Sequence, residues 1–260
     1  MKNIVLLAGL TALMMSSCEV KEKVSSSNGE PFGMNIACAD FGSVFPGEYN
    51  KDYTYPTDSD LVYWEKKGLK LVRMPFKWER LQYKLDGGLN KHDLEKMKEF
   101  VVAAQKRGIK VLLDLHNYCR RFENGDHRII GTYGITNQNY AGFWKKIASE
   151  FKDYDNIYGY GLMNEPHDLP DSISWFKMAQ LAIDSIRMVD TKNTIVVGGN
   201  SWSSAKRWLT ESDTLKFLKD PAENLMFEAH CYFDKDGSGT YKYSYEEEEG
   251  TPEKGRQLVA

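Results

Sequence analysis

Glu165 is the residue of this sequence whose type and position most directly suggest chemistry. It lies in Asn164-Glu165-Pro166, directly after the apolar, strand-like residues 158–163. Proline lacks a backbone donor and favours extended backbone in the residue before it, so we predict Glu165 to be the last residue of a strand. In a barrel of parallel strands, a carboxylate at that end of a strand lies where catalysis takes place. The alternative is a turn in which Glu165 is only solvated.

Polar residues also close three other strands that we predict. Arg73 lies near the end of the second strand, His116 and Asn117 close the third, and His230 is followed by Tyr232 at the end of the sixth. Because the carboxyl ends of parallel strands meet at one edge, we expect these side chains to converge on one cavity. The alternative for each His or Arg is a structural hydrogen bond to a buried acceptor.

The elements that must position these residues follow a repeating strand-helix pattern, in which short apolar runs alternate with longer amphipathic stretches. We predict six strands, at residues 32–37, 69–74, 110–116, 157–164, 194–198 and 225–230. We predict helices between them, at residues 59–67, 90–107, 139–151 and 173–189, and a glycine directly follows each of the first two.

The segments that follow the strands are longer than those that follow the helices, as in a barrel whose functional loops lie at one face. An open doubly wound sheet would carry a glycine-rich phosphate turn after its first strand, and residues 37–42 lack that glycine spacing. We therefore predict an α/β fold, a (β/α)8 TIM barrel of which about the first six strand-helix units are present.

A complete barrel of this kind has eight strands and about 250 residues, and six predicted strands have been used when the sequence ends. Residues 251–260 begin like a helix, with Thr251 as cap and Pro252 in the first turn, and contain no stop signal. We expect residues 31–260 to be a barrel domain that is incomplete at its C-terminus.

The N-terminus resembles an export signal, with Lys2, an apolar run at residues 4–15 that is too short to cross a bilayer, and Ser16-Ser17-Cys18. Small residues before Cys18 resemble a bacterial lipoprotein cleavage box. We predict a signal peptide at residues 1–17, lipidation of Cys18 and a flexible tether at 18–30. The protein would then be exported and anchored to the outer membrane of a Gram-negative bacterium, facing the periplasm or the cell surface. A soluble secreted protein with a chance cysteine is the alternative.

Composition narrows the class of partner. The 260 residues include 34 basic and 37 acidic side chains, for a net charge of −3, and the two signs are interspersed. No basic patch indicates nucleic acid, so we expect a neutral or weakly charged substrate and no nucleic acid. We also expect a monomer. Cys38, Cys119 and Cys231 show no paired metal-ligand spacing, and we expect buried thiols, although one pair could be bridged. We predict no metal and no cofactor, and a turn at residues 234–239.

Four motifs at the predicted strand ends are similar to those of glycoside hydrolase family 5, the cellulase-type barrels. They are Val-Arg-Met-Pro (72–75), Asp-Leu-His-Asn-Tyr (114–118), Leu-Met-Asn-Glu-Pro (162–166) and Glu-Ala-His-Cys-Tyr (228–232). The resemblance covers residues 32–239, and residues 200–202 and 234–239 look most like the endo-1,4-β-glucanases. An endo-mannanase or another hemicellulase of the family remains open, as does a non-catalytic glycan-binding lipoprotein.

The resemblance implies retaining hydrolysis of internal β-1,4 bonds in cellulose or related β-glucans, with two carboxyl groups about 5 Å apart. Glu165 would be the general acid/base and would need a raised pKa to hold its proton. Asn164 would bind the sugar 2-hydroxyl, Arg73 would orient the nucleophile, and the remaining site residues would bind substrate or the carboxylates: His116, His230 and Tyr232. The family's nucleophile closes a seventh strand that this sequence lacks, so the nucleophile stays unassigned.

Aromatic side chains near the strand ends could stack on sugar rings. We predict Trp202 as the main platform, with Trp78, Tyr118 and Asn117 as further substrate-binding residues. The tryptophans on predicted helix faces are expected in the core: Trp64, Trp144 and Trp175.

Overall fold

A computed structural model describes residues 32–244, 246–248 and 251–259, which belong to one compact unit. The predicted signal peptide, Cys18 and the predicted tether lie outside the described residues. No helix of the described ranges is long and apolar enough to cross a membrane.

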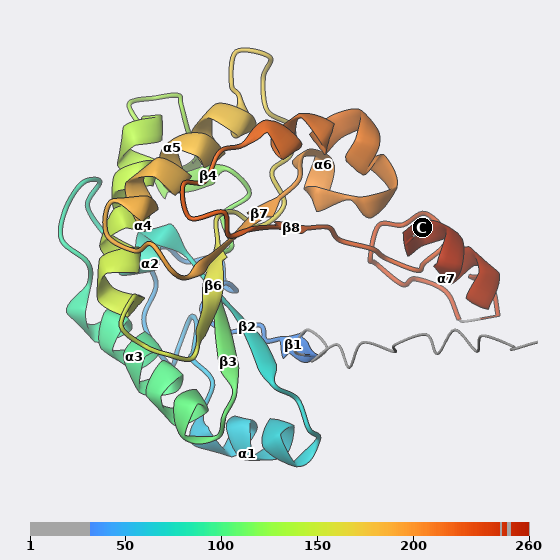
Figure 1. Ribbon diagram of the computed structural model, residues 1–260, viewed down its shortest axis with the longest axis horizontal. Helices are drawn as coiled ribbons and strands as arrows, with labels where there is room; N and C mark the ends of the chain where they lie inside the picture. Colours follow the sequence, from blue (N-terminus) through green and yellow to red (C-terminus); the bar gives the residue numbers. More distant parts are fainter. Residues whose placement is uncertain (1–31, 245, 249–250, 260) are drawn as a thin grey trace, which may run out of the picture. The chain divides into compact units, whose positions relative to one another are not determined.

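Six parallel strands form one sheet, and each strand pairs with the next one in this list. The strands are β1 (Gly33–Asn35), β2 (Leu71–Phe76), β3 (Lys110–Leu115), β6 (Ile157–Gly161), β7 (Thr194–Gly198) and β8 (Leu225–Glu228). A doubly wound sheet reverses its strand order at one point, whereas this order runs one way throughout. The predicted fold class is confirmed: the sheet is the six-stranded part of a TIM barrel (Figure 1).

Four main helices lie on one face of this sheet (Figure 1). They are α1 (Asp58–Lys66), α3 (Lys91–Lys106), α4 (Asn137–Phe151) and α5 (Trp175–Arg187). The Asn90 side chain accepts hydrogen bonds from two amides at the start of α3, near the predicted start of that helix, whereas Thr136 caps α4, which begins two residues before the predicted start at residue 139. Trp64, Trp144 and Trp175 are buried against the sheet, as predicted.

Helix α4 also holds the end of β6. The Tyr140 hydroxyl and the Trp144 indole both donate to the carbonyl oxygen of Leu162, at 2.7 and 3.0 Å. The strand was predicted to run to residue 164 and ends at Gly161, but two backbone hydrogen bonds continue its pairing. Leu162 donates to Val196 at 2.9 Å, and Asn164 donates to Leu115 at 2.8 Å. The backbone is therefore well placed up to the residue before Glu165.

The structure adds short elements that sequence analysis did not predict. They are α2 (Trp78–Leu81), the hairpin β4 (Arg120–Glu123) with β5 (Asp126–Ile129), α6 (Asn200–Ser203), η1 (Ala205–Arg207), η2 (Trp208–Ser212) and η3 (Asp213–Phe217). The hairpin turn is Asn124-Gly125, with both residues at positive φ, and this dipeptide is a strong hairpin signal that could have been recognised. The predicted helix after Thr251 is present as α7 (Pro252–Val259).

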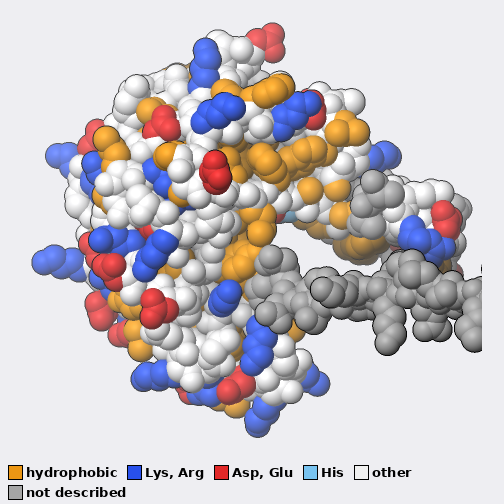
Figure 2. All heavy atoms as spheres, viewed as in Figure 1, with side chains coloured by type: hydrophobic (Ala, Val, Ile, Leu, Met, Phe, Trp, Pro, Cys, Tyr) orange, Lys and Arg blue, Asp and Glu red, His pale blue; other side chains and the backbone are white. Residues whose placement is uncertain are grey.

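The opposite face of the sheet, which would be the interior of a closed barrel, is hollowed and hydrophobic (Figure 2). It forms a cavity of about 810 Å³. Met34 of β1 and Phe227 of β8 are 37% and 42% exposed there, although barrel interiors are normally filled by such side chains. β1 and β8 are the two ends of the strand order.

Candidate active site

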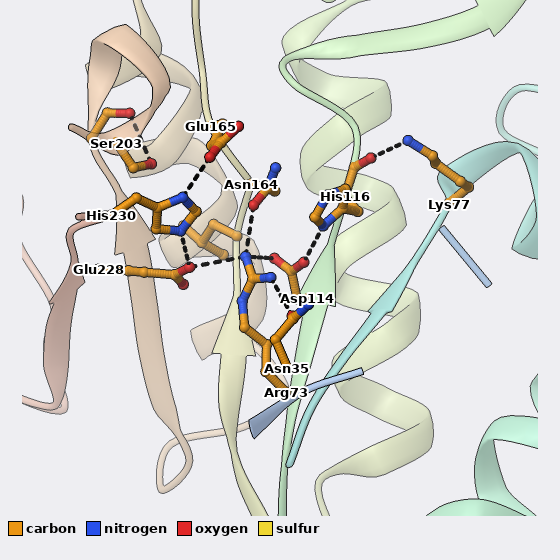
Figure 3. Close-up of polar contacts among 12 residues, drawn as sticks. Asn35, Arg73, Lys77, Asp114, His116, Asn164, Glu165, Ser203, Glu228 and His230 are labelled. Carbon is orange, nitrogen blue, oxygen red and sulfur yellow. Dashed lines mark hydrogen bonds and ion pairs between the residues drawn. The ribbon is translucent and has the colours of Figure 1, made fainter. Parts of the chain in front are cut away.

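Arg73 is the centre of the polar network at the base of the site (Figure 3). Its guanidinium contacts Asp114 of β3 at 3.0 Å and Glu228 of β8 at 2.9 Å. It also donates to the side-chain oxygens of Asn35, at 2.7 Å, and Asn164, at 2.8 Å. Burial lowers the pKa of Arg73, but the charges of Asp114 and Glu228 outweigh burial and bring this pKa above its ordinary value. The guanidinium therefore stays charged. We call Arg73, Asp114 and Glu228 the strand network, since each lies within a strand.

His230 joins this network to Glu165. Its Nδ1 lies 2.6 Å from Glu165 Oε1, and its Nε2 lies 2.6 Å from Glu228 Oε1. The Tyr232 hydroxyl donates to the same Glu165 oxygen at 3.2 Å. The structure thus brings together the residues that sequence analysis placed at the ends of two separate strands.

The electrostatics of this contact differ from expectation. Burial lowers the pKa of His230, but the carboxylates of Glu165 and Glu228 outweigh it and raise that pKa to about 9. Burial raises the pKa of Glu165, yet its bonds to His230 and Tyr232 bring it below the ordinary value. The prediction of a raised pKa for Glu165 is therefore wrong for this structure. Near neutral pH, an imidazolium lies between two carboxylates.

The expected backbone of Glu165 is also wrong. Glu165 is not an extended strand residue but has φ of 46°, in the left-handed region that bulky residues rarely adopt. It lies beyond the last residue of β6, where the chain turns, and its side chain points to His230 (Figure 3). Such backbone strain is concentrated at functional sites.

His116 and Tyr118 line the site from the end of β3. His116 Nδ1 contacts Asp114 Oδ2 at 2.8 Å, and the two aromatic rings meet edge-on at 5.2 Å. Lys77 donates to the carbonyl oxygen of His116 at 2.5 Å, and its ammonium lies 5.1 Å from the centre of the Tyr118 ring. Burial and the charge of Glu165 raise the pKa of Tyr118 to about 12, so its hydroxyl stays a hydrogen-bond donor.

Trp202 borders a cavity of about 540 Å³ that Glu165, His230 and Tyr232 also line. It is 39% exposed, and its backbone φ is 59°. Its amide donates to the carbonyl oxygen of Pro166 at 3.1 Å, which ties the segment after β7 to the Glu165 loop. We call Tyr118, Glu165 and Trp202 the loop rim, since each follows a strand and has left-handed backbone.

Two predicted substrate-binding residues are not available to substrate. Trp78 is fully buried because α2 turns it inward, where it stacks on Phe143 at 5.3 Å. Asn117 is 4% exposed, accepts a hydrogen bond from the Trp78 amide at 2.9 Å and donates to Glu79 at 3.0 Å. Asn117 is a structural residue of the loop that carries Tyr118, Trp78 belongs to α2 and donates to Asn117, and both predictions of substrate binding are wrong.

Asp114 is a site residue that sequence analysis did not single out. It is a buried carboxylate within an apolar strand, two residues before His116. Alternation along a strand places these two residues on the same face, which is the signal that could have identified it.

Residues 234–239 form the predicted turn. Asp234 accepts hydrogen bonds from the amides of Gly239 and Thr240, each at 3.1 Å. Among the described residues, no cluster of His, Cys, Asp or Glu could hold a metal ion. Cys38 and Cys119 are buried with free thiols, and burial raises the pKa of each.

A parallel barrel sheet with a carboxylate, charged groups and aromatic rings at the carboxyl ends of its strands is the arrangement of a barrel-type glycoside hydrolase. Residues 25–259 match the cellulase family, glycosyl hydrolase family 5. The chain belongs to this family.

Curated relatives are fungal endoglucanases. The chain is 33% identical over 215 residues to the manganese dependent endoglucanase Eg5A of Phanerodontia chrysosporium. The matched region covers 80% of this chain and 54% of that protein. The chain is 35% identical over 212 residues to a probable endo-beta-1,4-glucanase B of Neosartorya fischeri, covering 80% of this chain and 61% of that protein. The chain thus spans between half and two thirds of the length of these relatives.

Solved structures of two Cel5A proteins also resemble this chain. Endoglucanase Cel5A of Pseudomonas stutzeri, in complex with cellobiose, is 37% identical, with a TM-score of 0.80 over 88% of this chain and 68% of that chain. XacCel5A in complex with cellopentaose is also 37% identical, with a TM-score of 0.75 over 88% of this chain and 75% of that chain.

Proposed function

We propose that this protein hydrolyses internal β-1,4-glycosidic bonds in cellulose or a related β-glucan, with Glu165 as the general acid/base. The observation that carries the proposal is the position of Glu165: its carboxylate lines the 540 Å³ cavity and accepts hydrogen bonds from His230 and Tyr232. Relatives and neighbours named as endoglucanases support the reaction, and the cellobiose and cellopentaose bound to two of them support the substrate class.

In a retaining mechanism, Glu165 protonates the leaving oxygen while a second carboxylate about 5 Å away attacks the sugar. The described carboxylates that line the two cavities beside Glu165 are already engaged. Glu228 is bound by Arg73 and His230, while Asp234 and Asp236 accept backbone amides of their own turn. We assign the nucleophile to none of them and propose that it comes from outside the described residues.

The second carboxylate would also correct the protonation of Glu165. With His230 as its charged neighbour, Glu165 has a lowered pKa and is ionised near neutral pH. A further negative charge facing Glu165 would raise its pKa and favour its protonated form. It would also compete with Glu165 for the positive charge of His230. Asn164, held by Arg73, would meanwhile offer its side chain to the sugar 2-hydroxyl.

The test is release of reducing ends from soluble carboxymethyl cellulose by the full chain and its Glu165→Gln variant. Loss of the acid/base is expected to lower kcat/KM by about 10²- to 10⁴-fold, with oligosaccharide binding retained. Glu95→Gln, on the exposed surface of α3, is the matched control. Unchanged activity in Glu165→Gln would contradict the assignment of Glu165 as the general acid/base.

A non-catalytic glycan-binding protein is the second candidate, favoured by the lack of an unengaged second carboxylate among the described residues that line the two cavities. It predicts that the wild-type chain binds cellopentaose but releases no reducing ends, and that Glu165→Gln changes neither result. The same assay with mannan and xylan distinguishes a hemicellulase from an endoglucanase.

We also propose that the protein is a lipid-anchored monomer at the outer membrane, with the anchor on Cys18. Cys18→Ser is expected to move the protein from the membrane fraction to the soluble fraction of a Gram-negative host and to abolish labelling with an alkyne fatty acid. Membrane association of the Cys18→Ser variant would contradict the anchor.

A further inference from the structure

Three aromatic rings from three separate loops meet beside the site. The His167 ring stacks on Trp202, with ring centres 4.7 Å apart and planes inclined by 12°. The Tyr118 ring meets His167 edge-on at 5.7 Å. The three residues follow β3, β6 and β7, so the contact joins all three loops through His167. Sequence analysis gave His167 no role.

Both nitrogens of the His167 ring have a partner. Nδ1 lies 2.9 Å from Asp168 Oδ2, and Nε2 lies 3.4 Å from Arg120 Nη1. A guanidinium only donates, so Nε2 accepts and the Nδ1 proton goes to Asp168. The ring is therefore held against rotation as well as stacked.

Arg120 connects this ring to the neighbouring loop. The same Nη1 donates to the carbonyl oxygen of Tyr118 at 2.7 Å and to that of His167 at 3.3 Å. Arg120 is the first residue of β4, so the hairpin β4–β5 supplies the residue that ties the Tyr118 loop to the His167 loop.

Trp202 separates two cavities. One, of about 540 Å³, contains Glu165, and the other, of about 500 Å³, contains His167 and Asp168. His167 thus supports the indole from the second cavity, while Trp202 remains 39% exposed. The backbone at Ser201 and Trp202 is left-handed, and the Arg207 guanidinium lies 5.9 Å from the centre of the indole ring.

We propose that His167 is a positioning residue, fixed by Arg120 and Asp168, that holds the Trp202 indole as a stacking surface for a pyranose ring next to Glu165. The ligand class is a β-1,4-linked pyranose oligosaccharide, and this rests on the proposed function. A flat ring on Trp202 contributes only if the indole is already oriented, because an indole that must be ordered on binding loses part of the stacking energy.

The experiment is a double-mutant cycle on oligosaccharide binding, measured by calorimetry with the full chain carrying Glu165→Gln so that no ligand is cut. The variants are His167→Ala, Trp202→Ala and both together, each with cellopentaose, mannopentaose and xylopentaose. His167→Ala is expected to weaken binding about threefold to tenfold when Trp202 is present, and to change nothing when Trp202 is Ala. A role in general stability would weaken binding equally in both backgrounds.

Two further variants complete the design. His167→Phe keeps a flat ring and is expected to recover most of the affinity lost in His167→Ala. His92→Ala removes a histidine outside the site, whose ring centre lies 5.2 Å from that of Tyr49. This variant is expected to bind the oligosaccharides like the parent. Additive effects of His167→Ala and Trp202→Ala, or a His167→Phe variant no better than His167→Ala, would overturn the positioning role.

The outcomes separate this proposal from the proposed function. Binding of mannopentaose or xylopentaose in place of cellopentaose contradicts a glucanase, while coupling measured on that ligand still supports the positioning role. Binding of cellopentaose without coupling keeps the glucanase and overturns the positioning role. Binding of none of the three ligands overturns both.

Discussion

The strand network and the loop rim lie side by side in one site, yet the protein builds them differently. Arg73, Asp114 and Glu228 occupy regular strand positions, and their charged ends meet at 2.9–3.0 Å. The rim residues all have left-handed backbone, with φ between 46° and 59°, and depend on contacts between loops. Trp202, for example, is placed by a hydrogen bond to Pro166 and by the ring of His167.

This difference separates stability from recognition. Strand positions are set by backbone pairing, so the network is rigid, and its buried charges are stable only because they are paired. The rim is strained and partly exposed, and strain of this kind persists only where the surroundings support it. We therefore expect damage to the network to unfold the protein and damage to the rim to weaken ligand binding.

The largest effect is expected for Arg73→Met. It removes the guanidinium that pairs with the carboxylates of Asp114 and Glu228, in a site where the Asp114 side chain is 1% exposed, and leaves them only their histidine contacts. The free energy of unfolding should fall by about 3–5 kcal/mol, measured by urea denaturation near neutral pH. Arg128→Met, in the hairpin β4–β5, is the control and should lose less than about 1 kcal/mol. A loss below about 1 kcal/mol in Arg73→Met would show that the network does not dominate stability.

The pH dependence of stability should report the contact between network and rim. The pKa of folded His230 is about 9, above its ordinary 6.5, so its contribution is complete below pH 6.5 and is lost as the pH rises to 9. The loss should be about 3 kcal/mol over this range. Glu165 and Glu228 have lowered pKa values, so their contributions are present above pH 4.5 and are lost as the pH falls.

The measurement is urea unfolding from pH 4 to 10, with His230→Asn as the test variant. That variant should lose most of the decline between pH 6.5 and 9, whereas His92→Ala should keep it. A decline of the same size in His230→Asn would assign the titration to another group.

The smallest effect on stability is expected for Trp202→Ala. Because the indole is 39% exposed and its main ring contact is with His167, the free energy of unfolding should change by about 1 kcal/mol or less. Binding of cellopentaose should weaken by about tenfold or more, since the surface on which a pyranose ring would stack is lost with the indole. A large loss of stability in Trp202→Ala with unchanged affinity for cellopentaose would contradict the assignment of ligand binding to the loop rim.

The strands and most helices could be predicted because their signals are local. Apolar runs marked the strands, capping residues marked the helices, and Arg73, Glu165 and His230 were recognised by their places at strand ends. Trp78 was misplaced because it too follows a strand, and only the tertiary fold shows that α2 turns it into the core. Glu165 was misjudged in conformation because the preference of a residue before proline is weaker than the contacts that hold its loop.

The sequence by itself determined the order of strands and helices, the family motifs and the residues available for the site, since hydrophobic pattern and strand alternation depend on neighbours in the chain. Only the tertiary structure decided the charge states and the roles of single side chains. His230 is charged because two carboxylates from different segments reach it, and Trp202 is oriented because a histidine from another loop lies against it. Both effects depend on distances between residues that are far apart in the sequence.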